Sequence, residues 1–302
     1  MAVEKEETKA GFVSLIGAPN AGKSSITNHF AGSKVSIVSN KAQTTRAVIK
    51  GIGVFENTQI IFLDTPGIFS PKRRLDRAMV LSAWEGAKDA DIVVLVVDAK
   101  RGFDFESRAI VQKLKEDKVK AVLVLNKTDL VKKEKLLDLS AEINAMYAFE
   151  KTFFVSAQTG EGLEDFYAYL AENLPQSPWF YPEDEMSDMP LKLLAAELVR
   201  EKLFLNLKDE LPYALTVEPE LWQRRDDGSV RAEMTIYVER DNQKIIVLGK
   251  GGQMIKKIGM AARKELEELL DERIHLFLFV KVRENWGNDP ARYKIWGLNY
   301  NA

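Results

Sequence analysis

The chain has 302 residues, of which 46% are hydrophobic and 29% charged, so it has the composition of a globular protein with room for two domains. It contains no cysteine, which excludes disulfides, thiolate metal sites and cysteine nucleophiles, and its two histidines, His29 and His275, lie far apart in the sequence. Because the formal net charge is only −2, any nucleic-acid binding must depend on a local basic patch.

Neither a signal peptide nor a membrane-spanning helix is expected. The first ten residues are polar and charged, lack the apolar stretch of a signal peptide, and are predicted to form a tail. The longest apolar runs, such as Ile92–Val97, are far shorter than the ~20 residues that cross a bilayer.

Residues 11–174 alternate strand-like and helix-like segments, which predicts a mainly parallel sheet with helices on both faces. The second and third strands are separated by only a few residues and should form an antiparallel hairpin at the sheet edge. The expected strands are Phe12–Ile16, Val48–Phe55, Gln59–Leu63, Asp91–Val97, Val119–Leu125 and Thr152–Val155. The expected helices are Ser25–Ala31, Leu75–Lys88, Glu106–Asp117, Lys132–Tyr147 and Gly162–Leu174.

A phosphate loop follows the first strand. The eight residues fit the pattern G-x-x-x-x-G-K-[ST], in which glycines let backbone N–H groups approach the phosphate oxygens closely. Lys23 is expected to contact the β- and γ-phosphates, and the Ser24 hydroxyl to ligate Mg²⁺, with Ser25 opening the following helix. The residues of this loop are Gly17, Ala18, Pro19, Asn20, Ala21, Gly22, Lys23 and Ser24.

A guanine-binding motif is predicted after the strand Val119–Leu125. The Asp129 carboxylate can accept hydrogen bonds from N1–H and the 2-amino group of guanine, whereas adenine has no 2-amino group. Asn126 and Lys127 should brace the base and the phosphate loop, and after the next strand Ser156 and Ala157 provide a backbone N–H for the guanine carbonyl oxygen.

Two segments are predicted to switch with the nucleotide state. The first is Gln43-Thr44-Thr45-Arg46, where one threonine should complete the Mg²⁺ coordination, and we favour Thr45 over Thr44. The second is Asp64-Thr65-Pro66-Gly67, where Asp64 should hold Mg²⁺ through water and the Gly67 N–H should contact the γ-phosphate.

Hydrolysis is expected to be slow. Ile68 stands where many small GTPases have a glutamine that orients the attacking water, and its side chain cannot hydrogen-bond. Asn20 is a candidate for binding a monovalent cation such as K⁺ beside the phosphates, and an ordinary loop residue bonded to its own backbone is the alternative.

The proline-rich stretch 175–190 is predicted to link this domain to a second domain at 191–302. The second domain has the order α-β-β-α-α-β, and a G-x-x-G loop precedes its last helix. Between Arg240 and Lys264 there are seven basic residues and one acidic residue. This favours a KH module, so we expect Lys244–Leu248 to be helical despite its β-branched residues. The predicted RNA-binding residues are Gly249, Lys250, Gly251, Gly252, Lys256, Lys257 and Arg263.

The chain resembles the Era family of bacterial GTPases over about residues 11–298. The resemblance rests on the four GTPase motifs, the Gln43–Arg46 switch, and Arg200–Phe204 with Lys208–Tyr213 at the start of the second domain. Ser24-Ser25 replaces the usual Ser-Thr, which should leave Mg²⁺ ligation intact. The resemblance implies an α/β P-loop GTPase domain followed by an α+β type II KH domain.

The resemblance also implies a function. Family members hydrolyse GTP and use the KH domain to bind the 3′ end of 16S ribosomal RNA during maturation of the 30S subunit. They are cytoplasmic and often associate loosely with the inner face of the cell membrane, and we expect a monomer. Two alternatives are an RNA chaperone in which GTP turnover is incidental, and a signalling switch whose basic patch binds anionic lipid.

Overall fold

The computed structural model describes residues 8–41 and 43–302, which form two compact units. The first unit extends to Ser36 and includes Thr45–Asp188 and Lys294–Ala302. The second comprises Ile37–Thr44 and Met189–Tyr293. Three segments therefore differ from the expected domain boundaries: 37–44 belongs to the second unit, while 175–188 and 294–302 belong to the first.

The first unit is built on a six-stranded sheet with the order β2-β3-β1-β4-β5-β6. Every neighbouring pair is parallel except β2 and β3, which form the expected antiparallel hairpin at one edge. The strands are β1 (Lys9–Ile16), β2 (Ile49–Phe55), β3 (Thr58–Asp64), β4 (Ile92–Asp98), β5 (Val122–Asn126) and β6 (Thr152–Val155).

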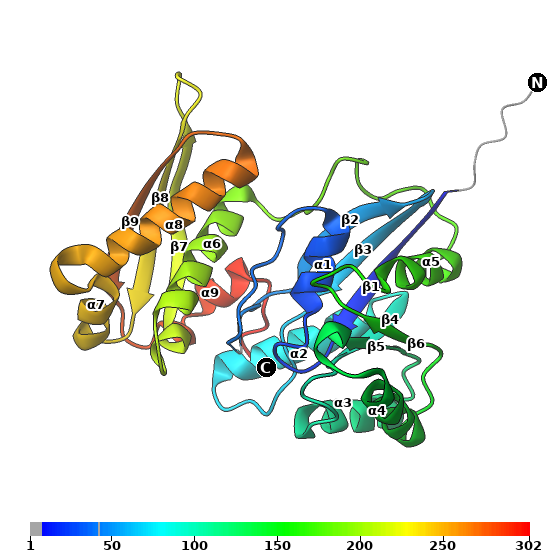
Figure 1. Cartoon of the computed structure of the whole chain (residues 1–302). Coiled ribbons are helices and arrows are strands. Elements are labelled where there is room, and N and C mark those ends of the chain that lie inside the picture. The colour runs from blue at the N-terminus through cyan, green and yellow to red at the C-terminus, as the bar shows by residue number, and fades with distance from the viewer. Residues whose placement is uncertain (1–7, 42) are drawn as a thin grey trace, which may run out of the picture. The chain divides into compact units, whose positions relative to one another are not determined.

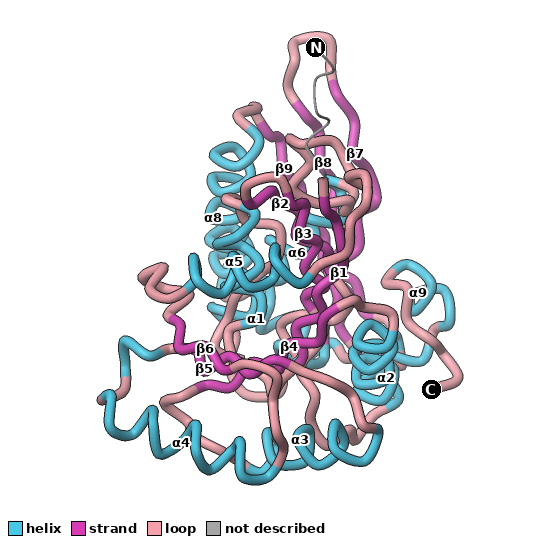
Figure 2. Tube along the Cα trace, turned by 90° about the vertical axis from the view of Figure 1, so that its right-hand side faces the viewer, coloured by secondary structure: helices cyan, strands magenta, loops and turns pink. Residues whose placement is uncertain are grey.

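Helices cover both faces of this sheet, as Figures 1 and 2 show. Helices α1 (Lys23–Ala31) and α5 (Leu163–Asn173) pack on one face around Phe62 and Phe166. Helices α2 (Arg74–Lys88), α3 (Phe105–Asp117) and α4 (Lys133–Met146) pack on the other. The loops that leave the carboxyl ends of β1, β3, β5 and β6 contain the nucleotide motifs, and this edge is where parallel α/β sheets bind ligands.

Residues 175–188 are not a free linker, because they are bonded to the strands of the first unit. The Gln59 side-chain oxygen accepts hydrogen bonds from the backbone N–H groups of Phe180 (2.9 Å) and Tyr181 (3.1 Å). Ile52 N–H donates to the carbonyl of Met186 at 2.9 Å. The predicted tail is also shorter than ten residues, since β1 begins at Lys9, and residues 1–7 lie outside the described part of the chain.

The second unit has the predicted order α-β-β-α-α-β, with a three-stranded sheet in the order β7-β8-β9. The β7–β8 pair is antiparallel and the β8–β9 pair parallel. Helices α6 and α8 lie side by side against one face of this sheet (Figure 1). The elements are α6 (Leu191–Asn206), β7 (Leu215–Arg224), β8 (Val230–Val238), α7 (Asp241–Leu248), α8 (Gln253–Leu270) and β9 (Ile274–Val282).

The β-branched segment Lys244–Leu248 is helical as predicted, because it forms the last five residues of α7. The Gln243 side chain accepts hydrogen bonds from the N–H groups of Glu239 (2.8 Å) and Arg240 (3.1 Å), which fixes the start of the helix. Ile245 and Ile246 remain 69% and 54% exposed. These two β-branched side chains are therefore not needed in the core, and no burial is lost when the segment is a helix.

The C-terminal residues were expected in the second domain, but 294–302 pack in the first unit. The Arg74 guanidinium lies over the Tyr300 ring, 4.4 Å from its centroid, and Arg77 Nε donates to the Ala302 carbonyl at 3.4 Å. These contacts attach the end of the chain to α2. A further helix, α9 (Pro290–Ile295), precedes them and was not predicted.

Candidate functional site

The phosphate loop has a backbone that only glycine permits at two positions. A Cβ on Gly17 would lie 2.3 Å from the Val96 carbonyl oxygen. A Cβ on Gly22 would lie 2.0 Å from Nδ2 of Asn126, and the φ of Gly22 is +98°. Gly22 caps α1 without a side chain, so the N–H groups of the first helical turn face the loop that a phosphate would enter.

Lys23 is buried at the centre of the loop. Its ammonium donates hydrogen bonds to the carbonyl oxygens of Gly17 and Ala18, each at 3.1 Å. Burial lowers the pKa of Lys23 to about 8, although the carboxylate of Asp64 acts in the opposite direction. An incoming phosphate would supply the negative charge that this buried ammonium lacks.

Three predicted metal ligands, Ser24, Thr45 and Asp64, lie together beside Lys23. Ser24 Oγ donates to Asp64 Oδ2 at 2.6 Å and lies 3.0 Å from Thr45 Oγ1. Ser36 Oγ also donates to Asp64 Oδ2, at 2.7 Å. Thr44 is oriented differently, because its hydroxyl donates to the carbonyl of Lys41 at 2.7 Å.

The chemistry of this corner fits Mg²⁺. Within residues 8–41 and 43–302, the buried Oδ1 of Asp64 has no hydrogen-bond partner, so it is a free ligand oxygen. Burial raises the pKa of Asp64, and the hydrogen bonds from Ser24 and Ser36 oppose that rise. The same part of the chain holds no group of three His, Cys, Asp or Glu side chains near enough to bind a metal. A metal here would therefore need hydroxyl and phosphate oxygens as well as the carboxylate.

The predicted base-recognition residues converge from two strand ends. Asn126 Nδ2 donates to the carbonyl of Ala21 at 2.9 Å, and Asn126 Oδ1 accepts from the N–H of Ala157 at 3.0 Å. Ser156 Oγ donates to Asp129 Oδ1 at 2.6 Å, which orients the carboxylate. The motifs at 126–129 and 156–157 thus form one connected network with the phosphate loop.

Lys127 fastens this network to the phosphate loop directly, and it also pairs with Asp98, a residue that was not predicted. Its ammonium donates to the carbonyl of Asn20 at 2.8 Å and pairs with Asp98 Oδ2 at 2.6 Å. Asp98 ends the buried strand β4, and an acidic residue at that position of a parallel sheet was the signal available.

The predicted switch residues 64–67 pack against the phosphate loop. Thr65 Oγ1 donates to the carbonyl of Leu15 at 2.6 Å, and the N–H of Ile68 donates to the carbonyl of Gly17 at 3.0 Å. A Cβ on Gly67 would lie 2.8 Å from Pro19 Cα, so glycine permits this close approach. The Ile68 side chain packs in the apolar core.

The second unit presents a glycine loop between α7 and α8. Gly249, Gly251 and Gly252 have φ values of +71°, +57° and +76°, a backbone that favours glycine. Lys250 is exposed within this loop, and Lys256, Lys257 and Arg263 are exposed on α8, which begins directly after it. Six of these seven predicted residues lie between Gly249 and Lys257, and Arg263 lies farther along α8.

A groove along α8 adds residues that the sequence analysis did not identify. Its volume is about 330 Å³, and β9 forms its other wall as an edge strand of the sheet. Exposed Met260 and Phe277 offer surfaces on which bases can stack, and the available signal was the apolar alternation along β9. The groove is lined by Ile255, Lys256, Gly259, Met260, Arg263, Leu276, Phe277 and Leu278.

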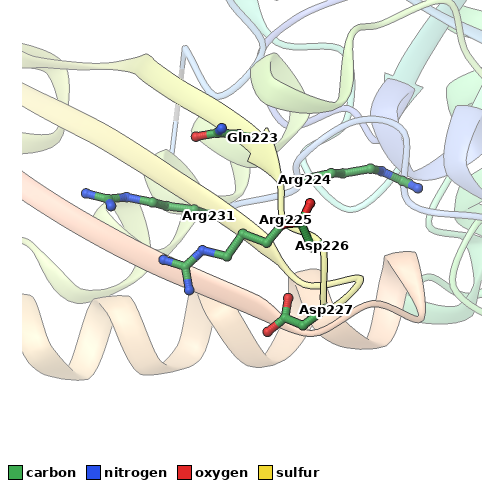
Figure 3. Close-up of a pocket in the computed structure, with 6 residues that line it drawn as sticks. All are labelled: Gln223, Arg224, Arg225, Asp226, Asp227 and Arg231. Atoms are coloured by element: carbon green, nitrogen blue, oxygen red, sulfur yellow. The ribbon is translucent and has the colours of Figure 1, made fainter.

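A second, more open hollow of about 500 Å³ lies at the tip of the β7–β8 hairpin (Figure 3). Arg224 pairs with Glu272, and Arg231 pairs with Glu233. Figure 3 shows Arg224 extending to one side and Arg225 and Arg231 to the other, so the three arginines do not all face one point. We therefore treat the tip as a solvated turn.

Comparison with known proteins agrees with this geometry. A family model described as a 50S ribosome-binding GTPase matches residues 12–127, and a KH domain model matches residues 210–287. GTPase Era of Rhizobium meliloti (strain 1021) is 60% identical over 293 residues, which cover 97% of this chain and 94% of the relative. This chain belongs to the Era family of GTPases. GTPase Era of Agrobacterium fabrum is 58% identical over 97% of this chain and 92% of the relative.

Two solved Era structures have the same architecture. One is Era in complex with MgGDPNP and nucleotides 1506–1542 of 16S ribosomal RNA, with a TM-score of 0.91, 36% identity and coverage of 96% of this chain and 99% of that one. The other is a single-residue variant of Aquifex aeolicus Era bound to GDP·AlF₄⁻, with a TM-score of 0.90, 36% identity and the same coverage. The expected P-loop GTPase domain and C-terminal KH domain are thus confirmed.

In the described part of this Era-family chain, every helix is too short or too polar to span a membrane.

Proposed function

We propose that this chain is a GTP-hydrolysing switch whose KH domain binds the 3′ end of 16S ribosomal RNA and assists assembly of the 30S subunit. The observation that carries the proposal is the hydrogen-bonded network that joins the motifs of Asn126 and Asp129 to the phosphate loop around Lys23, in a chain that also presents a Gly-Lys-Gly-Gly loop with an exposed lysine. An Era relative bound to both MgGDPNP and the 1506–1542 fragment of 16S RNA supports it.

Each residue of the network has a defined role in this proposal. Lys23 and the first-turn N–H groups of α1 bind the phosphates, while Asp129 recognises guanine. Ser24, Thr45 and Asp64 hold Mg²⁺, with Asp64 acting through water. When bound, Mg²⁺ supplies positive charge that stabilises the negative charge developing on the phosphate oxygens. The Gly67 N–H contacts the γ-phosphate and transmits its loss to the switch residues.

The remaining predicted nucleotide contacts are made by the phosphate loop, the two switch segments and the base-recognition motifs. They are Gly17, Ala18, Pro19, Asn20, Ala21, Gly22, Ser25, Thr44, Thr65, Pro66, Asn126, Lys127, Ser156 and Ala157. Because Ile68 is buried in the core and cannot orient water, the intrinsic rate of hydrolysis should be slow.

Guanine recognition is tested with Asp129→Asn. The variant loses a charge-assisted contact to the guanine N1–H and 2-amino group, so GTP affinity should fall about a hundredfold or more. Xanthosine triphosphate, which has a carbonyl in place of the 2-amino group, should bind the variant better than GTP does. Calorimetry with both nucleotides makes the comparison, and an unchanged preference for GTP would remove Asp129 from base recognition.

RNA binding is tested with Gly251→Asp. The φ of Gly251 is +57°, and a carboxylate there repels phosphate, so binding of a 16S 3′-end oligonucleotide should fall at least about tenfold. RNA binding is measured by filter binding at two salt concentrations, with a scrambled oligonucleotide as control. Sedimentation with anionic vesicles and GTP turnover with and without RNA test the lipid-docked switch and the RNA chaperone. Equal binding to vesicles and RNA would favour a lipid-docked switch, whereas RNA binding with no effect on GTP turnover would favour an RNA chaperone.

We further propose that Asn20 helps to bind K⁺ beside the phosphates. The φ of Asn20 is +66°, and its carbonyl is held by Lys127, which fixes the residue at the mouth of the phosphate loop. Hydrolysis should then be faster in K⁺ than in Na⁺, and Asn20→Ala should abolish the difference. Equal rates of the unaltered chain in both salts would contradict this role.

A further inference from the structure

The segment Ile37–Thr44 precedes the Mg²⁺ ligand Thr45 in the chain, yet it belongs to the RNA-binding unit. Ile37 is fully buried in the apolar core of that unit. The backbone N–H of Val38 donates to Glu201 Oε1 on α6 at 2.8 Å. The segment that leads into the predicted switch residues 43–46 is thus anchored to a helix outside the nucleotide-binding unit.

Lys41 provides a second anchor at the carboxyl end of α6. Its ammonium donates hydrogen bonds to the carbonyl oxygens of Phe204 and Leu207. The last carbonyl groups of a helix have no partner within the helix, and a cation there is also favoured by the helix dipole. Lys41 therefore satisfies one carbonyl in the last turn of α6 and that of the capping residue Leu207, and it ties the segment to the end of this helix.

Arg200, in the middle of α6, provides the third anchor. Its side chain is about 1% exposed and is ion-paired with Glu197, with Nε 2.7 Å from Glu197 Oε1. The Nη2 nitrogen also donates to the carbonyl oxygen of Thr44, and Nη1 lies 3.4 Å from the carbonyl oxygen of Gln43. A planar guanidinium can serve the carboxylate and the backbone at once, which a lysine ammonium does less well.

We propose that Arg200 is a positioning residue for GTP hydrolysis, although it lies in the RNA-binding unit. The Thr44 carbonyl is joined to the Thr45 nitrogen by the peptide bond, so fixing it limits where the Thr45 hydroxyl can lie. That hydroxyl is 3.0 Å from Ser24 Oγ. The proposal rests on the proposed role of Thr45 as a Mg²⁺ ligand. Arg200 and Lys41 order the segment that ends at Thr44, so the backbone next to Thr45 is held without an ordering cost at each turnover.

The experiment uses the full chain and two variants of the anchor. Arg200→Lys keeps a positive charge beside Glu197 but loses the fork that reaches Thr44, and Lys41→Met removes the contacts to the end of α6. Lys192→Met, an exposed lysine in the first turn of the same helix, is the matched control. Hydrolysis rates are measured across Mg²⁺ concentrations, together with GDP affinity and melting temperature.

Both anchor variants should raise the Mg²⁺ concentration for half-maximal hydrolysis about fivefold or more, because a misplaced ligand weakens the metal site. Their GDP affinity should stay within about twofold, since Asp129 and the phosphate loop are untouched. Lys192→Met should match the unaltered chain in every measurement. A merely structural role would instead lower GDP affinity, kcat and melting temperature together, and that result would overturn the proposal.

Thr45→Ala separates failure of this proposal from failure of the proposed function. If Thr45→Ala raises the Mg²⁺ requirement and the anchor variants do not, Arg200 is not a positioning residue while Thr45 remains a ligand. If Thr45→Ala leaves the Mg²⁺ requirement unchanged, the proposed metal site itself is wrong. Should Arg200→Lys unfold the chain, Lys41→Met alone decides, because its side chain lies outside the buried Arg200–Glu197 pair.

Discussion

Lys23 is the residue whose titration should report nucleotide binding. Burial lowers its pKa from 10.5 to about 8 in the nucleotide-free chain, so near pH 9 the folded protein holds it largely neutral. Phosphate raises the pKa again, and we expect GDP binding to take up a proton at about pH 9 and much less near pH 7. Calorimetry in two buffers with different ionisation enthalpies measures this uptake, with EDTA present to keep metal away from Asp64.

The lowered pKa of Lys23 also makes the stability of the folded chain depend on pH. The unfolded chain binds more protons at Lys23 than the folded chain does between about pH 8 and 10.5, so this group makes the free energy of unfolding rise with pH across that window. Lys23→Arg is the control, because arginine stays charged throughout. Equal proton uptake by the arginine variant and the unaltered chain would show that another group titrates.

At the residue scale, the sequence identified the side chains whose spacing is set by local chemistry. Gly17–Ser24 is contiguous because a single loop must wrap one phosphate, and such a pattern is visible without any fold. Asp98 and Ser36 escaped prediction because each acts through one long-range contact, with Lys127 and Asp64 respectively. Such partners become apparent only when distant strand ends meet.

At the element scale, periodicity predicted the strands and helices of the first unit, with most ends within a few residues, and the order of elements in the second. The helical assignment of Lys244–Leu248 went against β propensity and depended on the expected fold, since five isolated residues cannot decide between helix and strand. The groove between α8 and β9 was missed because its walls come from two elements, and neither wall has a motif of its own.

The proline-rich stretch predicted to link the domains, 175–190, does lie between them in the sequence, but its residues up to Asp188 belong to the first unit. Prolines do interrupt helices and sheets there, but interruption of regular structure does not mean freedom from contacts. Backbone groups of Phe180, Tyr181 and Met186 are bonded to residues of β2 and β3. A segment without secondary structure can therefore be as firmly attached as a strand.

At the scale of the whole molecule, two segments belong to the compact unit that their position in the sequence does not suggest. Residues 37–44 join the second unit, and residues 294–302 join the first. Neither segment has an apolar period, so composition gives no sign of its destination. The predicted switch residues 43–46 are consequently divided between the two units.

Because residues 37–44 belong to the second unit, we expect RNA binding and GTP hydrolysis to influence each other through Lys202. Its ammonium pairs with Glu201 Oε2 at 2.9 Å and with Glu265 on α8, the helix that begins after the glycine loop. Glu201 in turn accepts from the backbone of Val38. RNA that orders α8 should therefore steady the 37–44 segment and accelerate hydrolysis about fivefold, a typical coupling between linked sites.

Lys202→Gln should remove most of this acceleration while changing RNA affinity by no more than about twofold, because Lys202 lies on α6, outside the predicted RNA contacts. Single-turnover hydrolysis with and without a 16S 3′-end oligonucleotide measures the effect. Lys264→Gln, an exposed lysine of α8 that pairs only loosely with Glu268, is the matched control. If the oligonucleotide accelerates hydrolysis by Lys202→Gln and by the unaltered chain equally, the contacts among Glu201, Lys202 and Glu265 do not couple RNA binding to hydrolysis.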